Sequence, residues 1–197
     1  NLGRFYGYAW NGTNWLINLT INSSLGDIGS FSSPHVFYKD SSWYLLVGSN
    51  PSNNRFFGYV WNGTDWLINT TINSSLPTIP GGYTSPTVFY KDSSWYLLYG
   101  DINGLFYGYA WNGTDWRVNL TINSSLTDVG SYNTPFVFYK DSSWYLISGG
   151  NAGKYFGYTM NGTTGGGVSA NYSKHLTFRG TSHLNLSGSS RLIMRKE

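Results

Sequence analysis

Short runs of alternating apolar and polar residues, broken by turn-forming pairs, fill most of the chain. Residues 6–10 carry an aromatic side chain at every second position, and residues 15–19 repeat the alternation with Trp, Ile and Leu. Asn11-Gly12 lies between the two runs. Alternation with period two is typical of half-buried strands, and Asn-Gly is a strong hairpin signal. Residues 6–19 are therefore predicted to form a β-hairpin.

A second pair of strands follows a loop rich in Gly and Ser. Val36 and Tyr38 mark a third strand, and the run from Trp43 to Val47 marks a fourth. The residues between them, Asp-Ser-Ser, favour a tight turn. The first 50 residues are thus predicted to contain four antiparallel strands.

This pattern recurs three times and begins a fourth time. The units cover residues 5–55, 56–105 and 106–154, and a fourth begins at 155 with Met160 where Trp is expected. All nine Trp occupy three equivalent positions: Trp10, Trp61 and Trp111; Trp15, Trp66 and Trp116; Trp43, Trp95 and Trp144. Four strands in about 50 residues are typical of a propeller blade. The predicted fold is all-β, a β-propeller with three full four-stranded blades and a degenerate or incomplete fourth.

The pattern ends near residue 164, which predicts two segments. Residues 1–164 hold the propeller repeats, and 165–197 hold a hinge of three Gly followed by a strand-forming tail. The sequence allows two roles for residues 168–197. They complete a fourth blade in their own chain, or they form an arm that covers the sheet edge of another copy.

Composition narrows the class of protein. Aromatic residues make up 19% and charged residues 11% of the chain, and Cys is absent. Disulfides, thiolate metal sites and Cys nucleophiles are therefore excluded. Residues 166–197 hold five of the 12 Lys and Arg and only Glu197 as an acid, so the repeats lack the basic stripe of a nucleic-acid surface. No apolar run is long enough to span a membrane.

The repeats resemble those of secreted β-propeller proteins. Tyr-Lys-Asp-Ser-Ser-Trp-Tyr resembles a shortened Asp-box of sialidase-type propellers, although it lacks that motif's internal Gly. The Trp-rich blades of about 50 residues are similar to those of tachylectin-like propellers over residues 5 to about 163. That resemblance implies carbohydrate pockets between blades. Residues 101–104 resemble a calcium loop of integrin-type repeats, but they occur in one unit and lack further acids.

N-glycosylation sequons are unusually frequent, and three of them are repeated in each of the three units. The twelve candidate sites are Asn11, Asn18, Asn22, Asn62, Asn69, Asn73, Asn112, Asn119, Asn123, Asn161, Asn171 and Asn185. This density favours a glycoprotein made outside the cytoplasm. The alternative is that Asn-Gly-Thr and Asn-Ser-Ser are simply good turn and loop sequences. Asn11, Asn62 and Asn112, at the hairpin tips, are expected to be the most exposed.

The sequence offers no constellation typical of an enzyme. Asp40, Asp92 and Asp141 recur once per unit in a predicted turn, whereas a glycosidase needs two acids in one pocket. None of the three His belongs to the repeated pattern, and they show no metal-ligand spacing. We therefore expect a protein without enzymatic activity, cofactor or metal.

A binding or scaffolding function remains. The loops that vary between units keep an aromatic residue at matching positions, Phe31, Tyr83 and Tyr132, and these are the candidate carbohydrate-binding residues. The sequence favours a secreted, non-enzymatic glycoprotein that acts as a surface or adhesion scaffold, or as a subunit of a larger extracellular assembly. The alternative is a multivalent carbohydrate-binding lectin. The expected partners are glycans, other extracellular proteins, or copies of the chain joined through the C-terminal tail.

Overall fold

The computed structural model describes most of the repeat region in atomic detail. The described residues are 5–26, 28–29, 32–49, 55–76, 78–79, 85–126, 128–150, 155–161 and 169–172. Within these ranges the chain is mostly β-structure in antiparallel sheets, with three short helices, so the predicted predominance of antiparallel β-structure is confirmed. The predicted Gly hinge, the tail from residue 173 onward, and Phe31, Tyr83 and Asn185 lie outside the described residues.

The elements follow the same order in each repeat: two strands, a helix and two further strands. The first repeat contains β1 (Tyr8–Trp10), β2 (Trp15–Ile17), α1 (Leu19–Ser24), β3 (Ser33–Lys39) and β4 (Ser42–Gly48). The second contains β5 (Phe56–Trp61), β6 (Trp66–Ile68), α2 (Thr70–Ser75), β7 (Ser85–Lys91) and β8 (Ser94–Gly100). The third contains β9 (Phe106–Trp111), β10 (Trp116–Val118), α3 (Leu120–Ser125), β11 (Thr134–Lys140) and β12 (Ser143–Gly149). The strands β13 (Tyr155–Asn161) and β14 (Ser169–Tyr172) follow.

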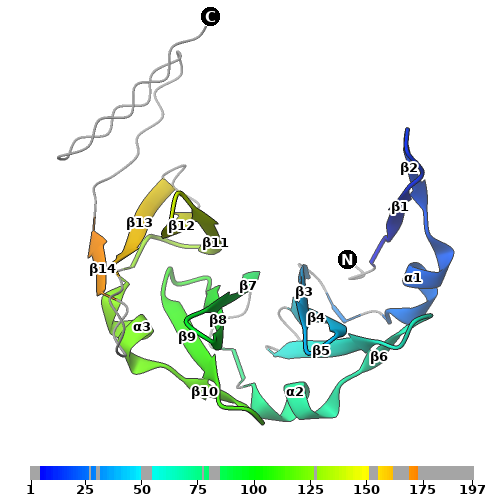
Figure 1. Ribbon diagram of the computed structural model, residues 1–197, viewed down its shortest axis with the longest axis horizontal. Helices are drawn as coiled ribbons and strands as arrows, with labels where there is room; N and C mark the ends of the chain where they lie inside the picture. Colours follow the sequence, from blue (N-terminus) through cyan, green and yellow to red (C-terminus); the bar gives the residue numbers. More distant parts are fainter. Residues whose placement is uncertain are drawn as a thin grey trace, which may run out of the picture.

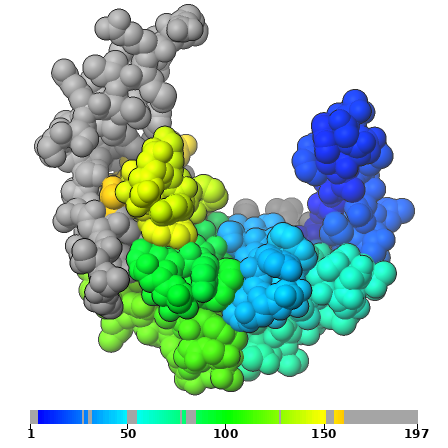
Figure 2. Space-filling view, in the orientation of Figure 1, coloured from blue at the N-terminus to red at the C-terminus, as the bar shows by residue number. Residues whose placement is uncertain are grey.

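The strands form a two-stranded sheet, β1-β2, and three four-stranded sheets arranged along an open arc (Figure 1). The four-stranded sheets have the orders β3-β4-β5-β6, β7-β8-β9-β10 and β11-β12-β13-β14. The space-filling view shows a wide gap between the β1–β2 hairpin and the sheet that contains β11 (Figure 2).

The sheets do not coincide with the units 5–55, 56–105 and 106–154 that the sequence predicted as blades. In each four-stranded sheet, the first two strands along the chain come from one unit and the last two come from residues after that unit. The connections explain this. Only a short segment separates β4 from β5, so these strands pair as neighbours, whereas a helix and a loop separate β2 from β3 and carry the chain to the next sheet.

The three short helices were not anticipated, because residues 15–19 were predicted as a strand followed by a loop. Each helix begins after an Asn whose side-chain oxygen accepts a hydrogen bond from the third following backbone N–H, as Asn119 does from Ile122 at 3.0 Å. Such N-caps satisfy a helix donor that otherwise lacks a partner. The Ile that donates this hydrogen bond also packs on a Gly before the hairpin turn, as Ile122 does on Gly108 of β9.

The turn between the third and fourth strands of each unit is confirmed as a tight two-residue hairpin. Asp92 and Ser93 have φ angles of 49° and 61°, and Lys91 pairs directly with Ser94. Two successive residues with positive φ match the right-handed twist of the adjoining strands. The repeated Asp therefore has a structural role in this turn.

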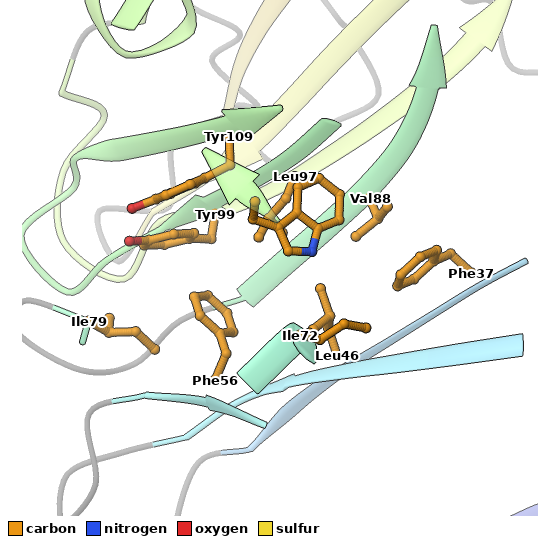
Figure 3. Close-up of a cluster of buried hydrophobic side chains, with 10 residues drawn as sticks. Phe37, Leu46, Phe56, Ile72, Ile79, Val88, Leu97, Tyr99 and Tyr109 are labelled. Atoms are coloured by element: carbon orange, nitrogen blue, oxygen red, sulfur yellow. The ribbon is translucent and has the colours of Figure 1, made fainter. Parts of the chain in front are cut away.

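The hydrophobic core is divided into clusters that lie between successive sheets. Phe37, Leu46 and Phe56 from one sheet meet Leu97 and Tyr99 from the next (Figure 3). The rings of Tyr99 and Tyr109 stack with centroids 5.9 Å apart, and burial raises the pKa of Tyr99 so that its hydroxyl stays neutral. A second cluster joins the sheets of β7–β10 and β11–β14, and a third lies under α1.

Candidate inter-sheet binding pocket

The first two strands of each unit form a hairpin, β1–β2, β5–β6 or β9–β10. The tip of each of these outer hairpins is fixed by a pair of Trp and by one Asn. In the third unit the rings of Trp111 and Trp116 lie 5.4 Å apart across the strand pair. Asn112 follows, and its Oδ1 accepts hydrogen bonds from the backbone N–H of Thr114 and Asp115 at 2.9 and 2.8 Å. The equivalent Trp and Asn residues of the other two units make the same contacts. The hairpin therefore holds its two indole rings in a fixed orientation.

A pocket of about 190 Å³ lies where this hairpin meets the preceding sheet. The preceding sheet and α2 form one side, and the Trp pair of the third unit forms the other. The lining residues are Phe37, Lys39, Tyr44, Asn69, Thr71, Ile72, Trp111 and Trp116. Drug-sized ligands usually occupy pockets of about 300–1,000 Å³, so this pocket suits a molecule the size of one ring.

The pocket combines an aromatic surface with a cation. The Nζ of Lys39 lies 5.1 Å from the centroid of the Trp111 ring, a cation–π distance, and it also pairs with the exposed Asp40. The Lys39 side chain is itself largely buried. An ammonium beside an indole can donate hydrogen bonds to a polar ligand that stacks on the ring.

Trp116 contributes a donor with no partner. Its side chain is buried, and within the described part of the chain its Nε1–H makes no hydrogen bond. A buried donor without an acceptor costs about 1–3 kcal/mol. The Nε1 of Trp116 has almost no accessible surface, so a ligand hydroxyl oxygen would reach it only after neighbouring side chains shift, and would then remove this cost.

The corresponding positions at the two neighbouring junctions are less complete. Towards the C-terminus, Lys91 is the counterpart of Lys39, but Met160 stands where Trp111 would be. Towards the N-terminus, the equivalent Trp61 and Trp66 are present, but no strands that correspond to β3 and β4 precede β1 in the described residues. The full set of aromatic, cationic and amide groups therefore meets between β3–β6 and β7–β10.

The residues predicted from the variable loops do not line this pocket. Tyr132 is exposed, has a φ of 61°, and donates its backbone N–H to the carbonyl of Ile102 at 3.2 Å. It is not among the pocket residues, and its proposed counterparts in the other units lie outside the described residues. Binding at Tyr132 thus stays a prediction separate from the pocket.

The repeated sequons have structural functions that the sequence did not reveal. The Oδ1 of Asn69 caps α2, and the Oδ1 of Asn73 accepts a hydrogen bond from the backbone N–H of Gly58. The same pair of contacts recurs in the first and third units. Asn62 and its counterparts at the hairpin tips are exposed, as expected. The signal that sequence reasoning missed was the spacing of four residues between a capping Asn and a second Asn.

Asp101 and His35 both have structural partners. Asp101 is buried, and its Oδ1 accepts from the backbone N–H of Asn103 and Leu105, both at 2.9 Å. The segment that resembles a calcium loop is thus an Asp-stabilised turn, and the described residues contain no cluster of metal-ligating side chains. His35 joins two sheets, since its Nε2 lies 3.1 Å from the backbone nitrogen of Val88. Burial lowers the pKa of His35.

Comparison with known proteins adds no relative. No protein-family model matches the chain, and a search of curated proteins finds no significant match. Among the described residues, none of the helices is long and apolar enough to cross a membrane.

Proposed function

We propose that the chain is a carbohydrate-binding module in which the sheets act as blades of a β-propeller. The observation that carries this proposal is the buried, unpartnered Nε1–H of Trp116 in the pocket where Lys39 faces the Trp111 ring. In this proposal the ligand is a single sugar ring. The module has no catalytic role, and its partners are glycans.

The chemistry of a sugar matches the groups in this pocket. The C–H bonds on one face of a pyranose pack on an indole, and its hydroxyls both donate and accept hydrogen bonds. Trp111 supplies the indole face, Trp116 a donor and Lys39 a second donor. A pocket with an apolar wall and a few polar groups is typical of small-molecule sites.

Binding of simple hexoses and N-acetylhexosamines, followed by calorimetry and Trp fluorescence, tests the proposal. Trp116→Phe keeps the ring but removes the donor, so we expect about three- to tenfold weaker binding. Trp111→Ala should abolish measurable binding. Trp61→Ala is the matched control, because Trp61 has the same place in its hairpin but no facing counterpart of Lys39 in the described residues, and it should bind normally.

Two outcomes would contradict the assignment. Equal affinity in W111A and W61A would mean that the pocket is not the site. Loss of glycan binding in Tyr83→Ala and Tyr132→Ala, with W111A unaffected and melting unchanged, would place binding in the variable loops.

We infer as a second candidate a secreted, glycosylated surface scaffold. The observation in its favour is that Asn11, Asn62 and Asn112 are exposed at hairpin tips, where Oδ1 accepts the turn's backbone hydrogen bonds and the amide nitrogen is the atom that would carry a glycan. Asn73 and Asn123 are half-buried and bonded to a neighbouring strand. Site mapping by mass spectrometry on secreted material should find glycans at the three tips and none at Asn73 or Asn123. An unmodified intact mass would remove this candidate.

A further inference from the structure

The first four-stranded sheet, β3–β6, has an open face on β3 and β4. Val36 on β3 is 49% exposed, whereas its counterparts Val88 and Val137 are each 8% exposed. Trp43 on β4 is also 49% exposed. These side chains belong to the face that, in the other two sheets, packs against the preceding sheet.

The covered counterparts of Trp43 show what this face lacks. The ring centroid of Trp95 lies 5.7 Å from that of Phe37 in the preceding sheet, and the ring centroid of Trp144 lies 5.5 Å from that of Phe89. In both cases the partner is a Phe on the first strand of the preceding sheet, β3 or β7. Trp43 has the same place in its own sheet, but no strand equivalent to β3 or β7 precedes it among the described elements.

The edge of β1 is open as well. The equivalent strands β5, β9 and β13 pair on one side with β4, β8 and β12, while β1 pairs only with β2 among the described strands. Tyr6, Tyr8 and Trp10 around this edge are exposed. An unpaired edge with exposed aromatic side chains is a template for another strand. The open surface at the N-terminal end thus fits a two-stranded hairpin.

The opposite end of the arc presents the complementary surface. Phe136 on β11 is 60% exposed, and Phe138 stacks on it with ring centroids 6.1 Å apart. Ile147 on β12 is exposed, while its counterparts Leu46 and Leu98 are buried. The β11–β12 hairpin therefore exposes the same kind of face that covers Trp95 and Trp144 within the chain.

We propose that a second copy of this chain docks head to tail, with its β11–β12 hairpin on Val36 and Trp43 and its β12 alongside β1. β1–β2 then takes the place on β12 that β13–β14 occupies in the single chain. β1 and β13 each begin a unit of the repeat. The exchange therefore replaces the pairing of β12 with β13 by the equivalent pairing of β12 with β1. β1 also carries Trp10 where β13 carries Met160.

The number of sheets decides between one copy and two. This step rests on the propeller architecture proposed above. If the chain closed on itself by this exchange, the ring would hold three sheets, fewer than the 4–8 blades that propellers typically contain. Two copies would close a ring of six. The arc is open between these two ends (Figure 2).

A pair of engineered cysteines tests the arrangement, because the chain contains no Cys of its own. The Oγ atoms of Ser33 and Ser85, at the starts of β3 and β7, lie 3.0 Å apart. By the repeat, Thr134 of one copy would meet Ser33 of the other in the same way. S33C/T134C should therefore oxidise to a covalent dimer on a non-reducing gel. S33C/S85C is the positive control and should cross-link within one chain.

Light scattering with matched variants provides a second measurement. The full chain should elute with twice its mass of 22.0 kDa, and Val36→Asp should reduce this to one chain. Val118→Asp is the control, since Val118 is 54% exposed on the outer strand β10 away from the proposed contact, and it should remain dimeric. The pocket between Lys39 and Trp111 lies within one copy, so V36D should keep sugar binding there, and loss of dimerisation is distinguishable from loss of the proposed function. In the dimer, Lys140 of the second copy would face Trp61, so the W61A control is measured in the V36D background. A monomeric wild type, a dimeric V36D, or a cross-link of S33C/T134C inside one chain would overturn the proposal.

Discussion

Replacing Gly108 by Ala should destabilise the protein because α3 lies directly on this strand position. A Cβ built at Gly108 would lie 2.5 Å from the Cβ of Ile122 and closer still to its Cγ2. Side-chain rotation cannot move the Ile122 Cβ, which is bonded to the helix backbone. The strand is also held in place, since the Gly108 N–H donates to Asn123 at 2.5 Å and its carbonyl accepts from the Asn119 N–H at 2.8 Å.

The expected loss follows from two opposing effects. Overpacking of a well-filled contact costs about 1–3 kcal/mol. Loss of backbone freedom in the unfolded chain returns about 0.4–1 kcal/mol when Gly becomes Ala. The net free energy of unfolding should fall by about 1–2 kcal/mol, which lowers the Tm by roughly 2–8 °C for a chain of this size.

Thermal unfolding by circular dichroism measures this loss, and Gly26→Ala is the matched control. A Cβ at Gly26 meets nothing within 4 Å, and its φ lies outside the positive range, so G26A should be as stable as wild type or slightly more so. Adding Ile122→Ala to G108A should cost less than I122A costs in the wild type, because Ala removes the closest contact, with Cγ2, although the contact with Cβ remains. Equal Tm values for G108A and G26A would refute the steric argument.

Three further substitutions have defined outcomes. Burial lowers the pKa of His35 below its ordinary 6.5, so the stability that neutral His35 contributes is complete above pH 6.5 and falls as the pH drops through the folded-state pKa. His35→Thr introduces the residue found at the equivalent position, Thr87, and should make the free energy of unfolding in urea less dependent on pH between about pH 7.5 and 5.5. If H35T and wild type lose equal stability on acidification, His35 is not the responsible group. Asn119→Ala removes the N-cap of α3 and should cost about 0.5–2 kcal/mol in urea unfolding, and an unchanged midpoint would show that water replaces the cap. Ser93→Gly relieves a φ of 61° and should raise the Tm, by the equivalent of about 1 kcal/mol, whereas a lower Tm would mean that the Ser side chain contributes more than the backbone strain costs.

Local signals in the sequence were sufficient for the strands and their turns. The Trp pair around Asn62-Gly63 marks a hairpin because two strands joined by a tight turn must place these side chains opposite each other. The Asp-Ser turn likewise sets the pairing of β7 with β8. Such features depend on residues close together in the chain, so one unit of the repeat already contains the information. The helices were missed because their evidence is a cap and a contact with a Gly eleven or more residues earlier.

The tertiary structure alone decided which strands share a sheet and which residues share a pocket. A repeat reads the same whether its boundary falls before the first strand or between the second and third, so periodicity cannot assign strands to sheets. Packing assigns them, because the helix on its Gly turns the chain away after the outer hairpin and leaves β4 free to pair with β5. Lys39 and Trp111 lie in different units and meet only because two sheets stack face to face. The sequence thus determined the hairpins and their repetition, while contacts between distant units determined the sheets, the pocket and the two exposed ends.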